Sequence, residues 1–252
     1  MRLRLIRHAT FLIVYNGRTL LLDPMLDDVG ARAAIENSPN PRNNPLVPLP
    51  MSAEALVPGV DAVLVTHTHS DHWDTKAGRL LPQNLPLFGQ PEDEAQFRSL
   101  GFTQVETIGQ PMRWNGIEIT PTGAQHGTGE IARMLAPVSG FVLRAAGEPV
   151  LYIAGDTIWC PEVEEALGKY QPAVTVVNAG GARFLEGDPI TMTAEDVIAV
   201  CRRAHATQVI ACHMEAINHC LLSRTDLAFQ LEAARVAGQV AIPQDGEWVE
   251  LR

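Results

Sequence analysis

The chain has 252 residues, of which 46% are hydrophobic and 19% charged, and its formal net charge is −10 at pH 7. This composition is typical of a folded globular protein with a large core and excludes an intrinsically disordered chain. Because only two of the basic residues are lysines and the balance is acidic, we expect no nucleic-acid partner, which would require a basic face.

Four scattered cysteines without a CxxC motif give no disulfide framework. No stretch approaches the ~18 apolar residues that cross a bilayer. The N-terminus alternates charged and apolar residues and lacks the continuous apolar core of a signal peptide. We therefore expect a cytoplasmic protein with one domain over residues 1–252 and no integral membrane segment.

The first predicted elements are strands at 3–6 and 11–15, then Asn16-Gly17, which is typical of a type I′ hairpin turn, and a returning strand at 19–22. Residues 25–60 follow, with six prolines and no regular pattern. An irregular segment of this length is usually functional. It is expected either to cover a binding site or to make an oligomer contact.

The apolar run 62–65 predicts a buried strand, and the seven residues after it read Thr66-His67-Thr68-His69-Ser70-Asp71-His72. Imidazole nitrogen and carboxylate oxygen are ligands of zinc and its neighbours, and a rigid strand end can aim several of them at one point. The alternative is a polar loop that happens to be rich in histidine. The density of these residues beside a buried strand favours a metal site.

Further strands are predicted at 85–88, 117–120, 141–143, 150–154, 173–177, 208–212 and 248–250, and helices at 75–81, from Pro91, at 161–168, from Thr193 to about 205, and from Ser223. Strands alternate with helices in the second half. The pattern predicts an α+β fold, a four-layer αββα sandwich of two mixed sheets with helices outside.

Three more candidate ligands, His126, Asp156 and His213, each follow a predicted strand. Taken singly, they could be a turn residue, an Asx turn and a core histidine. Together with the motif His67-x-His69-x-Asp71-His72, they resemble the signature of the metallo-β-lactamase-fold hydrolases. The opening segment, through Asp23-Pro24, resembles the branch that includes the ascorbate-6-phosphate lactonases and the phospholipase D acting on N-acylated phosphatidylethanolamine.

This resemblance implies two divalent metal ions. The first would be held by His67, His69 and His126, the second by Asp71, His72 and His213, with Asp156 bridging both. Nitrogen and oxygen ligands admit zinc, which we expect, and also manganese or iron. One major class of true β-lactamases carries cysteine at the position of Asp156, so lactam hydrolysis is not expected here.

The implied reaction is cleavage of a lactone, an ester or a similar small molecule by a metal-bound hydroxide. The alternatives are a phosphodiesterase acting on a small or lipid-like substrate and a metal-binding module without turnover. The expected partner is thus a small-molecule substrate, and self-association is left open.

Asp71 and His219 are the residues expected to act in catalysis, His219 either as a proton donor or oxyanion partner or, alternatively, as a helix cap. In the family, the aspartate matching Asp23 supports the histidine loop, and the alternative for Asp23 is a turn residue before proline. His8 is expected to approach the substrate or to cap a strand, and Glu215 to support a ligand histidine. The candidates for anion recognition are arginines, namely Arg133, Arg183 and Arg224.

Overall fold

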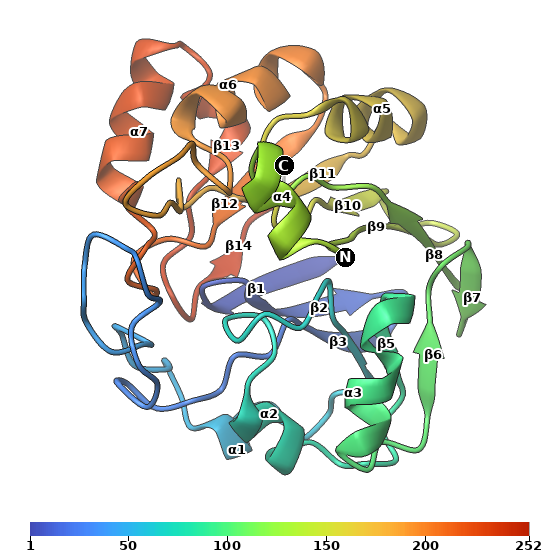
Figure 1. Cartoon of the computed structure of the whole chain (residues 1–252). Helices are drawn as coiled ribbons and strands as arrows, with labels where there is room; N and C mark the ends of the chain where they lie inside the picture. The colour runs from blue at the N-terminus through green and yellow to red at the C-terminus, as the bar shows by residue number, and fades with distance from the viewer. Residues whose placement is uncertain (252) are drawn as a thin grey trace.

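Two sheets packed face to face form the centre of the computed structural model, which describes residues 1–251 (Figure 1). Helices α1, α2 and α3 lie outside one sheet and α5, α6 and α7 outside the other (Figure 1). The predicted four-layer αββα sandwich is therefore confirmed.

Each sheet has seven strands. The first has the order β14 (Trp248–Val249), β1 (Arg2–Arg7), β2 (Thr10–Tyr15), β3 (Arg18–Leu22), β4 (Ala62–Leu64), β5 (Leu87–Gly89) and β6 (Val105–Thr107). The second has the order β13 (Val240–Ala241), β12 (Gln208–Cys212), β11 (Val174–Asn178), β10 (Leu151–Ile153), β9 (Gly140–Arg144), β8 (Ile117–Thr122) and β7 (Met112–Trp114).

The α-helices are α1 (Ala53–Leu56), α2 (Thr75–Leu80), α3 (Glu94–Ser99), α4 (Gly129–Leu135), α5 (Pro161–Tyr170), α6 (Ala194–Arg203) and α7 (Arg224–Ala233), with 3₁₀ turns at Pro91–Asp93 and Ala237–Gln239. One apolar cluster fills the space between the sheets, and two others lie beneath the outer helices. No helix in the described part of the chain combines the length and apolar character that a membrane crossing requires.

Local sequence signals account for several boundaries. Asn16 and Gly17 have φ of 49° and 70°, as a type I′ turn between β2 and β3 requires. Thr193 and Asp196 form a reciprocal capping box at the start of α6. The prediction missed β6, β7, α1 and β13 (Val240–Ala241), which are too short to show a hydrophobic pattern, and α4, which has no buried residue.

The strand directions bring distant loops to one edge. Strands β3, β4 and β5 are parallel, as are β10, β11 and β12, while β8 and β10 are both antiparallel to β9. The carboxyl ends of β8, β10 and β12 therefore lie at one edge of the second sheet. The loops after these strands, together with the loop after β4, carry the candidate metal ligands expected from the sequence.

The irregular segment expected at residues 25–60 is present apart from α1, and the chain after His213 holds it in place. The side-chain oxygen of Asn218, Oδ1, accepts hydrogen bonds from the Ile35 backbone N–H at 2.9 Å and from the Asn44 side-chain amide at 2.7 Å. The Asn218 amide donates to the Asn40 carbonyl at 2.8 Å and also to the Ser38 hydroxyl. One fully buried side chain thus ties down the middle of a long loop.

Replacing Asn218 with alanine is expected to release this loop, because these four hydrogen bonds and a fifth to the Ile35 carbonyl at 3.3 Å are lost and buried backbone groups are left unpaired. We expect the free energy of unfolding to fall by about 1–3 kcal/mol and protease cleavage within residues 31–46 to accelerate. Asn43→Ala is the control, because exposed Asn43 makes one long bond to the Gly30 carbonyl, 3.4 Å. Equal cleavage rates in the two variants would show that Asn218 does not hold the loop.

Candidate metal centre

The structure brings together all seven ligands expected from sequence. His67, His69, Asp71 and His72 follow β4 in the first sheet, and His126, Asp156 and His213 follow β8, β10 and β12 in the second. Their side chains fall into overlapping groups that could each hold a metal ion. All are buried except His69, which is half-buried.

One group has the spacing of a tetrahedral metal site. His72 Nε2 and His213 Nε2 are 3.2 Å apart, and each lies 3.3 Å from Asp156 Oδ1. Asp71 Oδ2 lies 3.4 Å from His213 Nε2. Metal bonds of 2.0–2.2 Å in a tetrahedron separate neighbouring ligand atoms by about 3.3–3.6 Å. His72, His213 and Asp156 therefore have the separations of three ligands around one ion, and Asp71 has that separation from His213.

The other oxygen of Asp156 faces a second group. Asp156 Oδ2 is 3.5 Å from His126 Nε2 and 3.9 Å from His67 Nε2, and the ligand nitrogens of His67, His69 and His126 lie within 4.8 Å of one another. His67 Nε2 is buried and has no hydrogen-bond partner among the described residues. A buried nitrogen without a partner is costly, and a metal ion at this point would remove the cost.

Hydrogen bonds at the far nitrogens set the direction of the ligand lone pairs. His126 Nδ1 donates to the Ile190 carbonyl at 2.7 Å, and His72 Nδ1 donates to Asp23 Oδ2 at 2.8 Å. With the proton on Nδ1, the Nε2 lone pair is free to bind a metal. The structure thus gives Asp23 the supporting contact expected from sequence.

Two further supporting residues were not found from the sequence. Thr66 donates its hydroxyl proton to Asp23 Oδ2 at 2.7 Å and accepts from His67 Nδ1 at 3.1 Å. The Asn178 amide donates to Asp156 Oδ1 at 2.6 Å. Asn178 could have been found from its position. It is a polar residue at the end of the apolar strand β11, and the neighbouring strands are followed by candidate ligands.

Burial and charge oppose each other within the cluster. Burial by itself raises the pKa of the Asp156 carboxyl, but the imidazoles around it, His213 first, outweigh burial and hold that pKa well below its usual range. Burial lowers the pKa of His67 well below 6.5. It also acts to lower the pKa of His72, but Asp156 and Asp23 raise it well above 6.5. A metal ion must displace a proton from His72, so binding weakens as pH falls.

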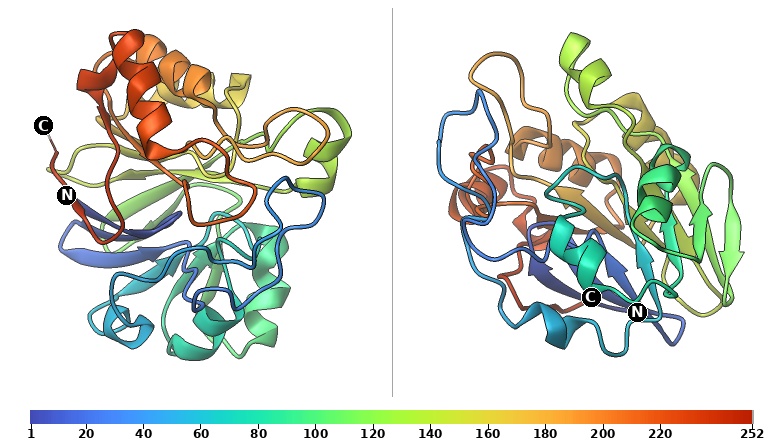
Figure 2. Two further views of the ribbon diagram at one scale, coloured as in Figure 1. Left: turned by 90° about the vertical axis from the view of Figure 1, so that its left-hand side faces the viewer. Right: turned by 60° about the horizontal axis from the view of Figure 1, so that its bottom comes forward.

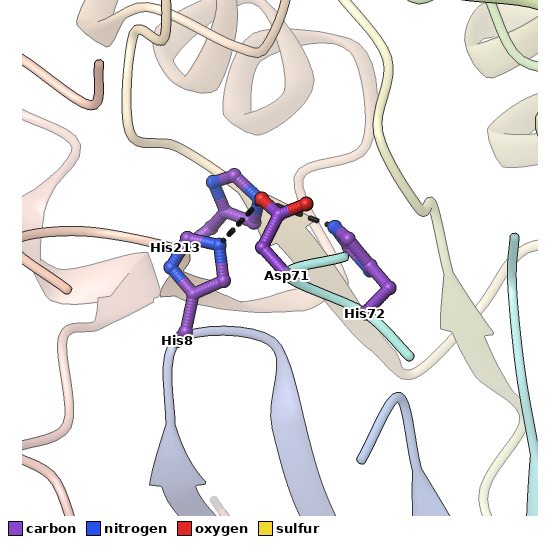
Figure 3. A group of neighbouring side chains, drawn as sticks. All are labelled: His8, Asp71, His72 and His213. Carbon is purple, nitrogen blue, oxygen red and sulfur yellow. Dashed lines mark hydrogen bonds and ion pairs between the residues drawn. The ribbon is translucent and has the colours of Figure 1, made fainter. Parts of the chain in front are cut away.

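His8, which lies in the turn between β1 and β2, belongs to this cluster as well (Figure 3). It is fully buried, and its Nε2 donates to Asp71 Oδ2 at 3.1 Å. Its ring lies over that of His213 with centroids 3.6 Å apart, and its carbonyl accepts the His213 N–H at 2.9 Å. His8 therefore contacts two candidate ligands, Asp71 and His213, and does not approach the substrate as one of the expectations had it.

Four residues at this edge have left-handed backbone conformations. The φ values are 63° for His8, 42° for Asp23, 69° for His213 and 65° for Glu215. Aspartate and histidine are enriched among the non-glycine residues that adopt this region. These turns direct the side chains of His8, Asp23 and His213 into the cluster.

A cleft of about 190 Å³ opens onto the candidate ligands. His69, Asp71, His126 and Asp156 form its floor, and the walls are His219 with the apolar side chains of Ile35, Leu135, Phe184 and Ile190. The Ile35 contact shows that the loop at residues 25–60 lies over the site. His219 is almost buried, its Nδ1 has no partner among the described residues, and Phe184 stacks on its ring.

Two expectations were wrong because of ion pairs. Glu215 supports no ligand histidine, because its carboxylate accepts from the guanidinium of Arg224 at 2.5 Å. Arg224 also bonds Asp245 at 2.6 Å, so its donors are used inside the fold and are not available to a substrate anion.

Comparison with known proteins gives the same picture. Residues 18–214 match a family described as the beta-lactamase superfamily domain. The chain is 37% identical over 250 residues to the UPF0173 protein YddR of Bacillus subtilis, covering 98% of each chain. It is 27% identical over 262 residues to a UPF0173 metal-dependent hydrolase of Azorhizobium caulinodans, covering all of both chains.

Two solved structures are similar over almost their whole length. An isothiocyanate hydrolase from Delia radicum gut bacteria is 35% identical, with a TM-score of 0.94 and 99% of both chains covered. A possible metal-dependent hydrolase from Veillonella parvula is also 35% identical, with a TM-score of 0.95 and coverage of 99% of this chain and 98% of the other.

The His8 contacts predict an effect on metal affinity. Asparagine tolerates the left-handed backbone at position 8 but does not extend as far toward Asp71. We expect His8→Asn to weaken metal binding by about 10- to 100-fold, as is usual when a partner of a ligand is lost. Competition with a chelator of known affinity measures this, and His205→Asn is the control because His205 is exposed. Unchanged affinity in His8→Asn would show that His8 does not position Asp71.

Proposed function

This chain belongs to the beta-lactamase superfamily and is a metal-dependent hydrolase of the metallo-β-lactamase fold, and we propose from that premise that it uses two divalent ions to hydrolyse a small molecule. His67, His69 and His126 would hold one ion, and Asp71, His72 and His213 the other. Asp156 would bridge them. The nitrogen and oxygen donors suit zinc, and also manganese or iron.

The proposal is carried by the position of Asp156. Its Oδ1 lies 3.3 Å from the ligand nitrogens of His72 and His213, and its Oδ2 lies 3.5 Å from that of His126. A structural zinc site needs only four ligands and leaves no open position, whereas here there are seven candidate ligands and four of them border an open cleft. Two bound ions would lower the pKa of a water molecule and polarise the oxygen or sulfur of the substrate.

His219, in the wall of the cleft, is the residue other than a metal ligand that we expect to act in catalysis. Burial lowers its pKa to about 4, and two bound cations would lower it further. The ring is therefore neutral near pH 7, so it suits donation of a hydrogen bond to a developing negative charge better than full proton transfer.

The substrate class that fits is an uncharged molecule with an electrophilic carbon, such as the lactone or ester expected from sequence. Neither lysine nor arginine lines the cleft among the described residues, which disfavours the phosphodiester alternative because an anion would meet no side-chain cation. Seven metal ligands disfavour the alternative of binding without turnover.

A second candidate reaction comes from the similar isothiocyanate hydrolase. Water adding to the central carbon of an isothiocyanate gives a thiocarbamate, whose C–N bond then breaks. The products are an amine and carbonyl sulfide, with both protons of the water on nitrogen and its oxygen on carbon. This substrate is also uncharged and electrophilic at carbon, so the same cleft suits it.

Turnover should require the metals and Asp156. We expect the metal-loaded protein to hydrolyse a lactone, an ester or an isothiocyanate faster than a chromogenic phosphodiester, and chelation to abolish that activity. Asp156→Ala is expected to lose metal and activity together, whereas Asp28→Ala, which removes an exposed carboxylate, retains both. Elemental analysis and rate measurements on the same samples test this. Normal metal content and rates in Asp156→Ala would contradict the proposal.

Removing His219 should slow turnover without removing metal. We expect His219→Ala to lower kcat by about 10²- to 10³-fold, as for loss of an oxyanion donor, and His219→Gln, which keeps an N–H donor, to restore part of it. Because the ring is neutral above its pKa of about 4, the ratio of wild-type to His219→Ala rates should be the same at pH 6 and pH 8. A ratio that grows toward low pH would indicate a proton donor instead.

A further inference from the structure

A second hollow, of about 430 Å³, lies beside the cleft. It is bordered by Ile131 and Met134 of α4, by Leu185 and Glu186, and by Asn37 of the long loop. Figure 2 (left) shows these segments gathered at one edge of the molecule. Three stretches of chain distant in sequence thus enclose one space.

The hollow and the metal cleft adjoin each other. Phe184 lines both of them. Ile35 and Leu135 line the cleft while Asn37 and Met134, their close neighbours in sequence, line the hollow. A molecule held at the candidate ligands can therefore extend past Phe184 into the hollow.

The hollow exposes apolar surface that the fold does not cover. Met134 is 72% exposed and Leu185 65% exposed, although both are large apolar side chains. Helix α4 has no buried residue. Apolar side chains exposed around a concave site usually mark a binding surface, and here the surface continues into the candidate active site.

The charged side chains that border the hollow and the cleft disfavour the binding of anions. Among the described residues, Glu186 is the one charged side chain that borders the hollow, and no lysine or arginine borders either space. The exposed guanidinium of Arg183 bonds the Gly187 carbonyl at 3.0 Å. A phosphate or carboxylate in the hollow would meet Glu186 without a compensating cation.

We propose that the hollow bordered by Ile131, Met134 and Leu185 binds an uncharged alkyl or aryl arm of the substrate while its electrophilic carbon lies at the metal ligands. The proposal rests on the function proposed above and narrows its substrate class to neutral molecules with one apolar arm. Because Phe184 borders both spaces, the occupant we infer is part of a substrate held in the cleft.

Binding of a neutral apolar probe tests the subsite without relying on turnover. The purified metal-containing protein is titrated with the fluorophore N-phenyl-1-naphthylamine, which is then displaced by 1-butanol, 1-hexanol and 1-octanol. We expect each added methylene to strengthen competition by about two- to fourfold, the larger value corresponding to full burial of a CH₂ group.

Substitutions in the hollow test whether the probe binds there. Met134→Glu and Leu185→Glu are each expected to weaken probe binding by at least about tenfold, since a carboxylate in an apolar groove must be desolvated or must displace the probe. Phe229→Glu is the matched control, because Phe229 is a 76%-exposed apolar residue of α7 that lines neither space. Equal loss in all three variants, no loss in any, or no dependence on chain length would overturn the subsite.

Failure of the subsite and failure of the function can be told apart. The chain-length series is repeated with p-nitrophenyl acetate, butyrate and hexanoate and with methyl and phenethyl isothiocyanate. Probe binding that follows the expected pattern while none of these compounds is hydrolysed would contradict the proposed function and leave the subsite intact. Hydrolysis at rates independent of arm length, with no probe binding, would contradict the subsite alone.

Discussion

The site depends on one buried carboxylate, that of Asp156, which contacts side chains from both halves of the sandwich. Asp156 comes from the second sheet, and each of its oxygens faces imidazoles of the loop that follows β4 in the first. Imidazoles hold the pKa of Asp156 well below its usual range. So many buried polar groups are tolerable only because nearly all have partners that fix their geometry.

These partners make the cluster rigid before any ion arrives. Asp23 accepts from both Thr66 and His72, and the Ile190 carbonyl fixes the ring of His126. Metal binding therefore does not have to order the ligand side chains, unlike in small zinc domains that fold only on binding. The apolar walls of the cleft and the hollow beside it come instead from loops outside the sheets, where sequence and shape can vary without disturbing the ligands.

The layer order and the seven candidate ligands were predictable because the histidine-rich loop has a strong local signal and the resemblance to a known family added His126, Asp156 and His213. Three histidines and an aspartate lie within six residues, and His213 follows an apolar strand predicted with its observed bounds. Other contacts had no such signal. His8 meets a partner 63 positions away, and the three-residue strands β6 and β7 are too short to show the alternation that predicts a strand. Glu215 was misjudged because sequence does not reveal its ion pair with Arg224.

The left-handed backbones of His8, Asp23 and His213 have a consequence for how the sequence can change. Glycine adopts these angles without steric cost, whereas non-glycine residues held in left-handed conformations incur strain on the order of 1–3 kcal/mol each. A glycine at such a position would relax the turn but delete the imidazole or carboxylate. Each of these positions therefore carries two requirements at once, a left-handed backbone and a particular polar side chain, and few residue types meet both.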